Sequence, residues 1–448
     1  MVMDDNDKQI WLVLSHGFNM DGRAASQTIT DKIPHLLNIG IKPIVVSAIT
    51  GKKDKVVEHH QVLPAGPVAL RFDLRHYLKQ RISSRFIYRI AMTVISLFLL
   101  PFILIEKIFM RIETHWSWAI TAYFTGARII RTCKPVLIYS TGGAYSAHLA
   151  GYWLARRYRL PWIAEIHDPM ILDTQPKNSR VRFSGWLEGI ICRHADFVWW
   201  FTEEAMARAR ARHPELADRG HCIIPGSNPP EFLRTPYRHS KHLVIGHFGS
   251  LADTRNLEYL LLGMRRILEN NPQWAEHFRI HLYGGGIDAI SARALLSFPH
   301  PSMIEQFGRL ENDPKTGESG RDQVIKRMNA VDCLLLLHGT IPVCEEYIPS
   351  KLYEYLWTQR PILALVWHNP QLEHMLRELG HWAVKADDAD SIASALEELH
   401  ARWMRDDLAD SGVPSPYTSE AATRQIIALA RESIKQHRAP DTLASPKH

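Results

Sequence analysis

Two glutamates, with seven residues between them, stand where an apolar run gives way to a helical pattern. The segment at 345–356 reads EEYIPSKLYEYL, with Glu346 ahead of Ser350 and Glu354 behind Lys351. Since Ser350 is a residue type that caps helices, we expect Glu346 in the loop that enters the helix and Glu354 one turn inside it. A helix start offers free N–H groups and a positive dipole to a diphosphate, and carboxylates accept hydrogen bonds from sugar hydroxyls. The spacing predicts a phosphate and carbohydrate site, although first-turn glutamates also favour the dipole without any ligand.

A histidine and an aspartate follow another apolar run, in the first half of the chain. His167 and Asp168 come directly after WIAEI at 162–166. If that run is a parallel strand, both side chains lie at its carboxyl end, where open α/β sheets bind ligands. We expect His167 to hydrogen-bond a sugar hydroxyl through its ring or carbonyl, and Asp168 to orient it or to meet an acceptor. The competing interpretation is a strand-end histidine that caps local backbone beside an Asp-Pro turn.

A glycine-containing loop follows the first apolar run. The sequence SHGFNMDGRAAS at 15–26 supplies Gly17 and Gly22, which permit a close approach of backbone to a ligand. It is not a G-x-G-x-x-G, so dinucleotide binding is disfavoured. Two other patterns are discounted. The DAD at 388–390 directly precedes a helical pattern and is better explained by capping. The GGG at 284–286 lacks the G-K-[ST] that completes a phosphate loop.

Short apolar runs alternate with amphipathic helical segments along the chain, which is typical of parallel α/β sheets. The expected strands are Ile10–Ser15, Pro43–Ala48, Val136–Tyr139, Trp162–Ile166, Phe197–Phe201, Cys222–Ile224, Leu243–Phe248, Arg279–Tyr283, Met303–Phe307, Cys333–Leu337, Ile362–Val366 and Trp382–Val384. The expected helices include Arg23–Asn38, Ala144–Arg157, Asn256–Leu268, Arg321–Ala330, Lys351–Thr358 and Ser391–Met404. Each half predicts one Rossmann-like domain, with the proline-rich segment 226–241 as linker and a cleft between the two sheets.

Length and composition agree with two folded domains. The chain has 448 residues, of which 46% are hydrophobic and 22% charged. The net charge of +6 suits an anionic partner without choosing among phosphates, lipids and nucleic acids. Five scattered cysteines without a C-x-x-C pair favour neither a disulfide framework nor a zinc site. The first nine residues are polar and acidic, so no signal peptide is expected and the protein is predicted to stay in the cytoplasm.

One segment breaks the alternation. Residues 90–105 carry no charge and are interrupted by Pro101. A spanning helix needs about 20 apolar residues and would separate two parts of the first domain, so a transmembrane helix is rejected. The run is preceded by Arg71, Arg75, Lys79, Arg81, Arg85 and Arg89, which one continuous helix would place within an arc of about 160°. Segment 71–110 therefore predicts an in-plane membrane anchor, with a buried core helix as the alternative.

The run PSKLYEYL with its E-x7-E spacing resembles the signature of retaining family-4 glycosyltransferases with the GT-B fold. Other stretches agree with that family in the same order. IGHFGSL at 245–251, followed by Arg255, resembles the first strand and phosphate-binding loop of the donor domain. HLYGGG at 281–286 resembles the second strand-turn, and QFGRL at 306–310 the segment that touches the nucleobase. WIAEIHDP is similar to the loop that places a His or Asp over the sugar. There are two departures: Ser250 stands where many relatives carry Arg, and no glycine follows Glu346.

The resemblance implies an N-terminal acceptor domain over 1–225, a donor domain over 242–410, and a helix within 411–448 that returns to the first domain. By the same resemblance Glu354 would bind the ribose, and Glu346 and His167 the transferred hexose. Arg255 and amide groups around Ser350 would hold the pyrophosphate. The other donor contacts that it implies are Lys351, Gly249, Gly284, Arg309 and Leu310. The loop with Gly17 and Gly22 would border the acceptor and the donor phosphate.

The activity that the resemblance implies is that of a retaining hexosyltransferase that needs no metal or other cofactor. Its partners would be a nucleotide-sugar donor and a glycan or lipid-linked acceptor of bacterial envelope polysaccharide synthesis, with no nucleic acid. The basic and apolar segment adds peripheral contact with the anionic inner face of the cytoplasmic membrane. Two alternatives stay open: a nucleotide-sugar 2-epimerase of the same fold, and a non-catalytic relative that binds a partner at the membrane.

Overall fold

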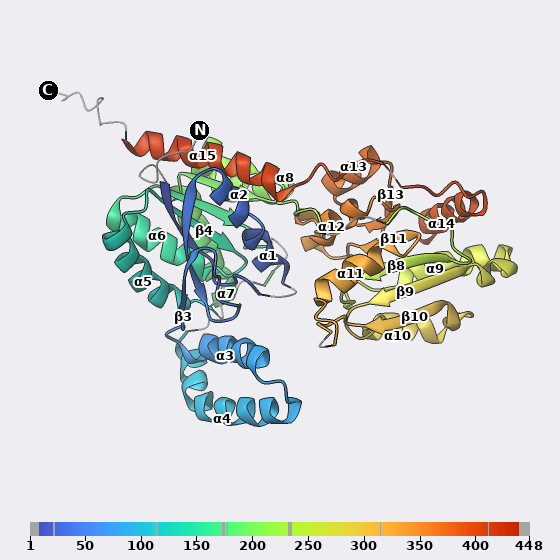
Figure 1. Cartoon of the computed structure of the whole chain (residues 1–448), viewed down its shortest axis with the longest axis horizontal. Helices are drawn as coiled ribbons and strands as arrows, with labels where there is room; N and C mark the ends of the chain where they lie inside the picture. Colours follow the sequence, from blue (N-terminus) through green and yellow to red (C-terminus); the bar gives the residue numbers. More distant parts are fainter. Residues whose placement is uncertain are drawn as a thin grey trace. The chain divides into compact units, whose positions relative to one another are not determined.

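A computed structural model describes residues 9–20, 23–110, 112, 115–172, 175–176, 178–231, 235–313, 315–410 and 412–438. These residues form two compact units (Figure 1). The first unit contains the chain up to Gly226 and again from Ser419, and the second contains Ser227–Thr418. The helix α15 (Ser419–Arg438) therefore belongs to the first unit, although it follows the whole second unit in the sequence.

A parallel sheet of seven strands forms the centre of the first unit, in the order β3-β2-β1-β4-β5-β6-β7. The strands are β1 (Gln9–Leu14), β2 (Ile41–Ala48), β3 (Glu58–Val62), β4 (Leu137–Gly142), β5 (Trp162–Ile166), β6 (Phe197–Trp200) and β7 (Gly220–Cys222). Alternate residues of β1 enter different layers, as the two-residue repeat of a strand requires. Leu12 and Leu14 lie in the apolar cluster that includes α5 and α6, whereas Trp11 and Val13 lie in the cluster that includes α15. Both faces of the sheet are thus covered.

The helices of the first unit connect these strands. They are α1 (Ala24–Thr30), α2 (Ile33–Asn38), α3 (Pro67–Arg81), α4 (Arg85–Phe109), α5 (Trp118–Cys133), α6 (Ser146–Tyr158), α7 (Ser179–His194), α8 (Glu203–Arg212) and the short 3-10 helix η2 (Pro214–Arg219). The single helix expected over Arg23–Asn38 is two helices, because the chain turns at residues 31–32 and α2 starts anew with Pro34 in its first turn.

Helices α3 and α4 pack against each other as a hairpin, which Figure 1 shows apart from the sheet. Two expectations for this region are wrong. The six basic residues do not lie on one helix, since the chain leaves helical geometry between α3 and α4 and Ile82 is extended. The apolar helix is not short, because it continues through Pro101 over 25 residues. Among the described residues it is the one helix long and apolar enough to cross a membrane.

A second parallel sheet, of six strands, forms the centre of the second unit, in the order β10-β9-β8-β11-β12-β13. Its strands are β8 (Leu243–Phe248), β9 (Phe278–Tyr283), β10 (Ile304–Gly308), β11 (Cys333–Leu337), β12 (Ile362–Val366) and β13 (Trp382–Lys385). Its helices are α9 (Glu258–Asn270), η3 (Pro272–Glu276), α10 (Ala289–Leu296), η4 (Pro301–Met303), α11 (Gly320–Asn329), η5 (Pro342–Glu346), α12 (Lys351–Thr358), α13 (Pro370–Glu378) and α14 (Ala389–Met404). In each sheet the strand order reverses beside the first strand, between β1 and β4 and between β8 and β11, and ligands of such sheets bind at this point.

The α/β fold with two Rossmann-like sheets is confirmed. The segment expected to be a linker differs, because much of it packs on the second unit. Ser227 pairs with Thr418 in a parallel bridge, and the Tyr237 hydroxyl donates to the Asp332 carboxylate at 2.8 Å. Asp388 caps α14 by accepting from two backbone N–H groups, so the capping interpretation of the DAD pattern is also confirmed.

Candidate functional site

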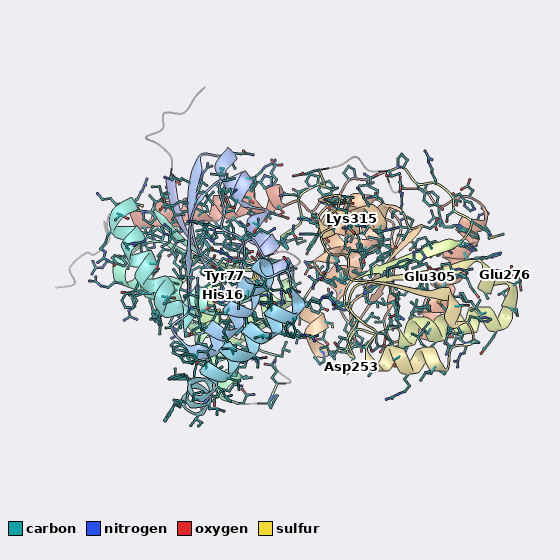
Figure 2. The ribbon with its side chains drawn as sticks, turned by 60° about the horizontal axis from the view of Figure 1, so that its bottom comes forward. His16, Tyr77, Asp253, Glu276, Glu305 and Lys315 are labelled. Carbon is teal, nitrogen blue, oxygen red and sulfur yellow. The ribbon has the colours of Figure 1, made fainter. Side chains whose placement is uncertain are left out.

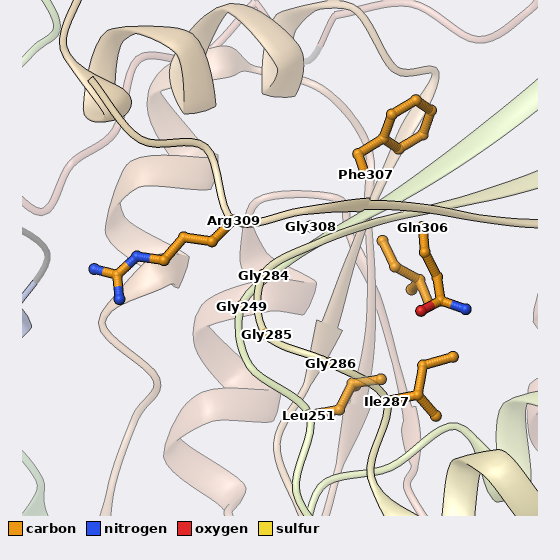
Figure 3. Close-up of a pocket in the computed structure, with 11 residues that line it drawn as sticks. Gly249, Leu251, Gly284, Gly285, Gly286, Ile287, Gln306, Phe307, Gly308 and Arg309 are labelled. Atoms are coloured by element: carbon orange, nitrogen blue, oxygen red, sulfur yellow. The ribbon is translucent and has the colours of Figure 1, made fainter. Parts of the chain in front are cut away.

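A pocket of the second unit lies at the carboxyl ends of β8, β9 and β10. It has a volume of about 540 Å³ and is lined by Gly249, Leu251, Leu282, Gly284, Gly285, Gly286, Ile287, Gln306, Phe307, Gly308 and Arg309. Figure 3 shows the Gln306 and Ile287 side chains converging on one space, while Phe307 and Arg309 point elsewhere. Five of the eleven lining residues are glycines, so backbone forms much of the pocket wall.

Glycines allow the three loops of this pocket to touch. A Cβ on Gly284 would stand 2.0 Å from the carbonyl oxygen of Gly249, a separation that no side chain could occupy. Hydrogen bonds connect each loop to the next one. Gly249 N donates to Tyr283 O at 2.8 Å, and Gly284 N donates to Gly308 O at 2.9 Å. Gly284 is thus required by the crossing of two backbones, which leaves their peptide groups at the pocket surface.

Lys351, the first residue of α12, reaches the same loop. A Cβ on Gly249 would lie 3.2 Å from Lys351 Cε, so the lysine stem runs over this glycine. Burial lowers the pKa of the Lys351 ammonium; Glu354 opposes this, while Arg255 and Arg309 lower the pKa further. The ammonium makes no hydrogen bond or ion pair within the residues that the structure describes. Three cations in mutual electrostatic range form a region that an anion would stabilise.

A tyrosine fixes the start of α12 beside the pocket. The buried Tyr355 hydroxyl accepts from Phe248 N at 3.1 Å and donates to Leu335 O at 3.3 Å, so it joins α12 to the end of β8 and the middle of β11. The expected capping by Ser350 is wrong. Its backbone is already helical, at φ −56° and ψ −24°, and its side chain makes no capping hydrogen bond. Capping needs an extended residue, and Ser350 is instead exposed, while Leu352 N and Tyr353 N donate to the carbonyls of Pro349 and Ser350 at 2.9 and 3.2 Å.

The two glutamates occupy different environments. Glu346 ends η5 and is 2% exposed, whereas Glu354 is half-buried in the first turn of α12. Glu354 lies 3.5 Å from the Arg321 guanidinium in an ion pair. Arg255 follows β8 and donates to the carbonyl of Ser250 at 2.9 and 3.3 Å. All of them belong to the second unit, near the strand ends that were predicted to carry the donor site.

The segment QFGRL contributes to the pocket through its first four residues. Gln306, Phe307, Gly308 and Arg309 line it, whereas Leu310 is not among the lining residues. Phe307 stacks on Tyr283, with ring centroids 4.7 Å apart and an interplanar angle of 13°. This stack holds the edge strand β10 on β9 and keeps the pocket wall in place.

In the first unit, His167 follows β5 and is held by buried polar groups. Its Nε2 lies 3.0 Å from Glu165 Oε1 and 3.0 Å from Thr141 Oγ1. Lys32 donates to both oxygens of Glu165, at 2.7 and 2.9 Å, and the Tyr139 hydroxyl donates to the same carboxylate. The His167 ring also packs on Phe201, with centroids 4.9 Å apart. The histidine is 8% exposed, and its orientation is determined by this network.

The remaining predicted residues of the first unit flank His167. Asp168 is exposed, and a Cβ on Gly143, in the loop after β4, would lie 3.4 Å from its carboxylate. Gly17 accepts a hydrogen bond from the Ser15 hydroxyl at 3.1 Å. Gly22 lies outside the described residues. The loops after β1, β4 and β5 therefore share one edge of the first sheet, since these strands are neighbours.

The loop after β1 also meets the base of the α3–α4 hairpin. His16 Nε2 lies 3.3 Å from Asp73 Oδ1, and both side chains are buried. The His16 ring packs on Trp118 and His115, with centroids 5.5 and 4.6 Å away. Figure 2 labels His16 and Tyr77, which lies one helical turn beyond Asp73 on α3. The hairpin is thus joined to the strand-end loops by a buried polar contact.

Several solved structures have a fold similar to that of this chain. Solved structures with the same arrangement include S. aureus TarM, at a TM-score of 0.59 and 8% identity over 95% of this chain and 99% of that one. They also include "Trehalose-6-phosphate from E. coli bound with UDP-2-fluoro glucose", at 0.55 and 12% identity over 96% and 97%. A third is a protein from Listeria monocytogenes proposed to be a UDP-N-acetylglucosamine 2-epimerase, at 0.52 and 10% identity over 96% and 97%. The fold is the two-unit fold called GT-B.

A family model matches part of the first unit. Residues 109–225 match the glycosyl transferase 4-like domain, which here spans α5 to β7 and contains His167 and Asp168. No curated protein matches the chain in a sequence search. Residues 109–225 thus resemble a glycosyl transferase 4-like domain and the whole chain shares the GT-B fold, in agreement with the resemblance of its motifs.

Sequence reasoning missed the residues behind His167. Glu165 and Lys32 are 133 positions apart and share no motif, so spacing could not connect them. One signal was present: a carboxylate in the middle of the apolar run WIAEI must find a buried partner. Within the described residues no group of three or more His, Cys, Asp or Glu side chains could hold a metal ion.

Proposed function

We propose that the protein transfers a hexosyl group, with retention at the anomeric carbon, from a nucleoside diphosphate sugar to a hydroxyl of an acceptor at a membrane surface. The observation that supports the donor class is the pocket of three glycine loops with Lys351, Arg255 and Arg309 close by. Glycine loops at strand ends, together with several cations close to one another and to a helix start, suit a diphosphate. The E. coli protein of the same fold is described as bound to UDP-2-fluoro glucose, which supports a nucleotide sugar.

In this proposal the second unit stabilises the leaving group. Lys351, Arg255 and the positive end of the α12 dipole would stabilise the negative charge that develops on the departing diphosphate, in place of a metal ion. Glu354 would accept from the ribose and Glu346 from the transferred sugar, and Arg309 would lie near the base. His167, with its oriented ring, would contact a sugar hydroxyl from the first unit. Positioning and electrostatic stabilisation would supply most of the rate.

A ligand screen tests the donor. We expect one of UDP, GDP, ADP or dTDP, or a sugar derivative of it, to raise the melting temperature, since a ligand that binds only the folded state stabilises it by mass action. Lys351→Ala should reduce the shift strongly at the same ligand concentration, and Arg405→Ala, which removes an exposed cation of the same unit, should leave it unchanged. An unchanged melting temperature with all four nucleotide series would refute the donor site.

The α3–α4 hairpin supports membrane contact. Only Leu99 and Ile103 of α4 are buried. Twelve apolar side chains of this helix are between 47% and 79% exposed, namely Phe86, Ile87, Ile90, Val94, Leu97, Phe98, Leu100, Phe102, Leu104, Ile105, Ile108 and Phe109. An apolar surface of this extent is rare on a protein surrounded only by water. The exposed cations Arg71, Arg75 and Lys79 lie on the neighbouring α3, where they could meet anionic headgroups.

The contacts of α4 favour an in-plane helix over a spanning one. Arg71 Nε donates to Ser96 Oγ at 2.9 Å, near the middle of α4. If α4 crossed the bilayer, Arg71 would lie near the bilayer centre, at a cost of about 2.5–3.5 kcal/mol or more. The carboxyl end of α4 is tied back as well, since Glu106 accepts from Val68 N at 2.9 Å and from Trp116 Nε1 at 3.0 Å. With α4 in the interface, α3 can keep its charges in the headgroup layer.

A membrane-bound enzyme of this kind suits an acceptor that is itself held in the membrane. We therefore place the protein on the cytoplasmic face of a bacterial membrane, acting on a lipid-linked intermediate or growing glycan of the cell envelope. The contact between His16 and Asp73 supports this, because it joins the hairpin to a loop at the strand ends where the acceptor would lie.

Vesicle flotation tests the membrane contact. The triple variant Leu97→Asn/Phe98→Asn/Phe102→Asn should lose roughly 100-fold or more in partitioning to phosphatidylcholine–phosphatidylglycerol vesicles, at about 1 kcal/mol per side chain. Leu296→Asn, which alters an exposed leucine of the second unit, is the matched control. Vesicles without phosphatidylglycerol should bind the wild type more weakly. Unchanged flotation of the triple variant would contradict the proposal that α4 contacts lipid. The proposal would also be contradicted if the wild type formed a dimer that the triple substitution dissociates, because α4 would then contact a second copy of the chain.

The epimerase alternative predicts different chemistry. An epimerase of this fold would convert a lone nucleotide sugar and would not need the exposed face of α4. Incubation of the protein with its best-bound nucleotide sugar, with and without membranes that carry acceptor lipids, separates the two. Turnover only with acceptor supports transfer, and isomerised sugar without acceptor supports epimerisation.

A further inference from the structure

The buried network behind His167 can decide which ring nitrogen carries the proton. Glu165 is 0% exposed, and its carboxylate receives both the Lys32 ammonium and the Tyr139 hydroxyl. His167 Nε2 faces the same carboxylate at 3.0 Å, while Nδ1 is buried and has no hydrogen-bond partner within the described residues. The two ring nitrogens therefore have different surroundings: Nε2 lies against a carboxylate, and Nδ1 does not.

A carboxylate that is ionised only accepts hydrogen bonds, so the nitrogen against it must donate. Burial alone would raise the pKa of Glu165, but the Lys32 ammonium and the His167 contact outweigh it and lower the pKa to about 2. The group thus stays ionised at neutral pH, and Lys32 neutralises it within a water-free site. Nothing in this arrangement depends on a bound ligand.

We propose that Glu165, held by Lys32, is a positioning residue that fixes His167 as the Nε2–H tautomer and leaves the Nδ1 lone pair to accept a hydrogen bond from a substrate hydroxyl. The claim rests on the proposed function for the identity of the substrate, but not for the tautomer. It is specific about direction: His167 accepts from the hydroxyl and does not donate to it. Loss of Glu165 would allow the ring to protonate Nδ1 instead and present a donor where an acceptor is needed.

The pair also explains why a charged residue is tolerated in the central strand β5. Lys32 comes from the turn between α1 and α2 and is 1% exposed, so neither charge is reached by water. A neutral residue pair could fill the same space without desolvation cost. The ionised carboxylate adds control over the histidine, which an apolar pair would not give.

Imidazole nitrogen NMR of the protein without substrate tests the tautomer directly. We expect the His167 signal, assigned by its absence in His167→Asn, to show a protonated Nε2 and a bare Nδ1 near neutral pH. In the double variant Lys32→Met/Glu165→Gln, which removes both charges together and leaves no unpaired one, the signal should shift towards a tautomer mixture. A wild-type ring protonated on Nδ1, or a double variant with the wild-type spectrum, would overturn the proposal.

Kinetics with the donor and acceptor found above give the second readout. The double variant should lose about 10- to 100-fold in kcat, the effect of one charge-assisted hydrogen bond, with a smaller change in KM and an altered pH profile. Glu188→Gln is the matched control, since Glu188 is also 0% exposed in the first unit and pairs with Arg212 and His213. If the double variant and Glu188→Gln lost the same factor in kcat, in proportion to their lower melting temperatures, the role of Glu165 would be merely structural. Failure to find any donor would sink the proposed function while leaving the tautomer measurement valid.

Discussion

Lys32 in the first unit and Lys351 in the second are both withdrawn from bulk water, yet only Lys32 has a carboxylate firmly against it. Lys32 donates to both Glu165 oxygens within 2.9 Å. Lys351 lies among Arg255 and Arg309, which disfavour its charge. In the first unit the buried charges of Lys32 and Glu165 therefore neutralise each other. In the second unit the positive charge around Lys351 is not neutralised to the same degree, and an anionic ligand would neutralise it. One arrangement orients a side chain, and the other would be stabilised by an anion.

The largest difference should appear when a carboxylate is removed from each unit. Glu165→Ala leaves Lys32 buried without a partner, and we expect a loss of about 3–5 kcal/mol in the free energy of unfolding. Glu354→Ala removes a half-buried partner of Arg321 and should cost about 1 kcal/mol or less. Urea unfolding of both variants measures this. Similar losses would mean that the two units do not treat charge differently.

Gly284→Ala should break the pocket of the second unit. The added Cβ would collide with the Gly249 carbonyl, so the loops must move apart, at about 1–3 kcal/mol, and nucleotide binding should be lost. Gly286→Ala, in the same loop, meets nothing within 4 Å and should bind nucleotide like the wild type. Calorimetric titration with the nucleotide from the ligand screen checks the pair. Normal binding by the Gly284 variant would show that the crossing of the loops does not shape the site.

Lys351→Met should separate binding from stability. The substitution removes a charge that burial and two arginines disfavour, so the melting temperature should stay the same or rise slightly. Nucleotide affinity should fall about 10- to 100-fold, because one contact to the diphosphate is lost. Thermal melts with and without nucleotide measure both quantities. A marked drop in stability without ligand would contradict the view that this lysine has no hydrogen bond or ion pair among the described residues.

His247 should make a small, pH-dependent contribution to the free energy of unfolding. Burial lowers its pKa to about 4, so it stays neutral in the folded state while the unfolded chain binds a proton below about pH 6.5. Stability is therefore lost as the pH falls from 6.5 towards 4. His247→Gln should reduce the loss between pH 7 and 5.5 by about 1 kcal/mol. The exposed His374→Gln is the control, and equal pH slopes in both variants would exclude this role.

Sequence patterns predicted the buried elements best. The bounds of β5, β8, β11, β12 and α12 agree with expectation, because apolar runs between turn residues have few alternatives. Strand β3 was not expected, since its sequence EHHQV lacks an apolar run and it forms the edge of the sheet by pairing with β2. Its existence depends on a neighbour that lies elsewhere in the chain.

The site was only partly predictable for a similar reason. The motifs located His167, Gly249 and Lys351, because each follows a strand or begins a helix. The partners of these residues depend on tertiary packing, as with Lys32 behind Glu165 or Tyr355 between β8 and β11. Ser350 shows the limit of residue type: a serine at the right position does not cap when its own backbone is helical.

Helix α15 has a consequence for how the protein is made. Its Ala422, Ile426 and Ala430 complete the apolar layer against Trp11 and Val13, yet the ribosome translates them only after the whole second unit. During synthesis the part of this layer that α15 supplies would be missing, at a time when the apolar side chains of α4 are exposed as well. Nascent chains should therefore need chaperones or early membrane capture, and a gene fragment that stops before residue 419 should yield aggregates where the 227–418 segment alone yields soluble protein.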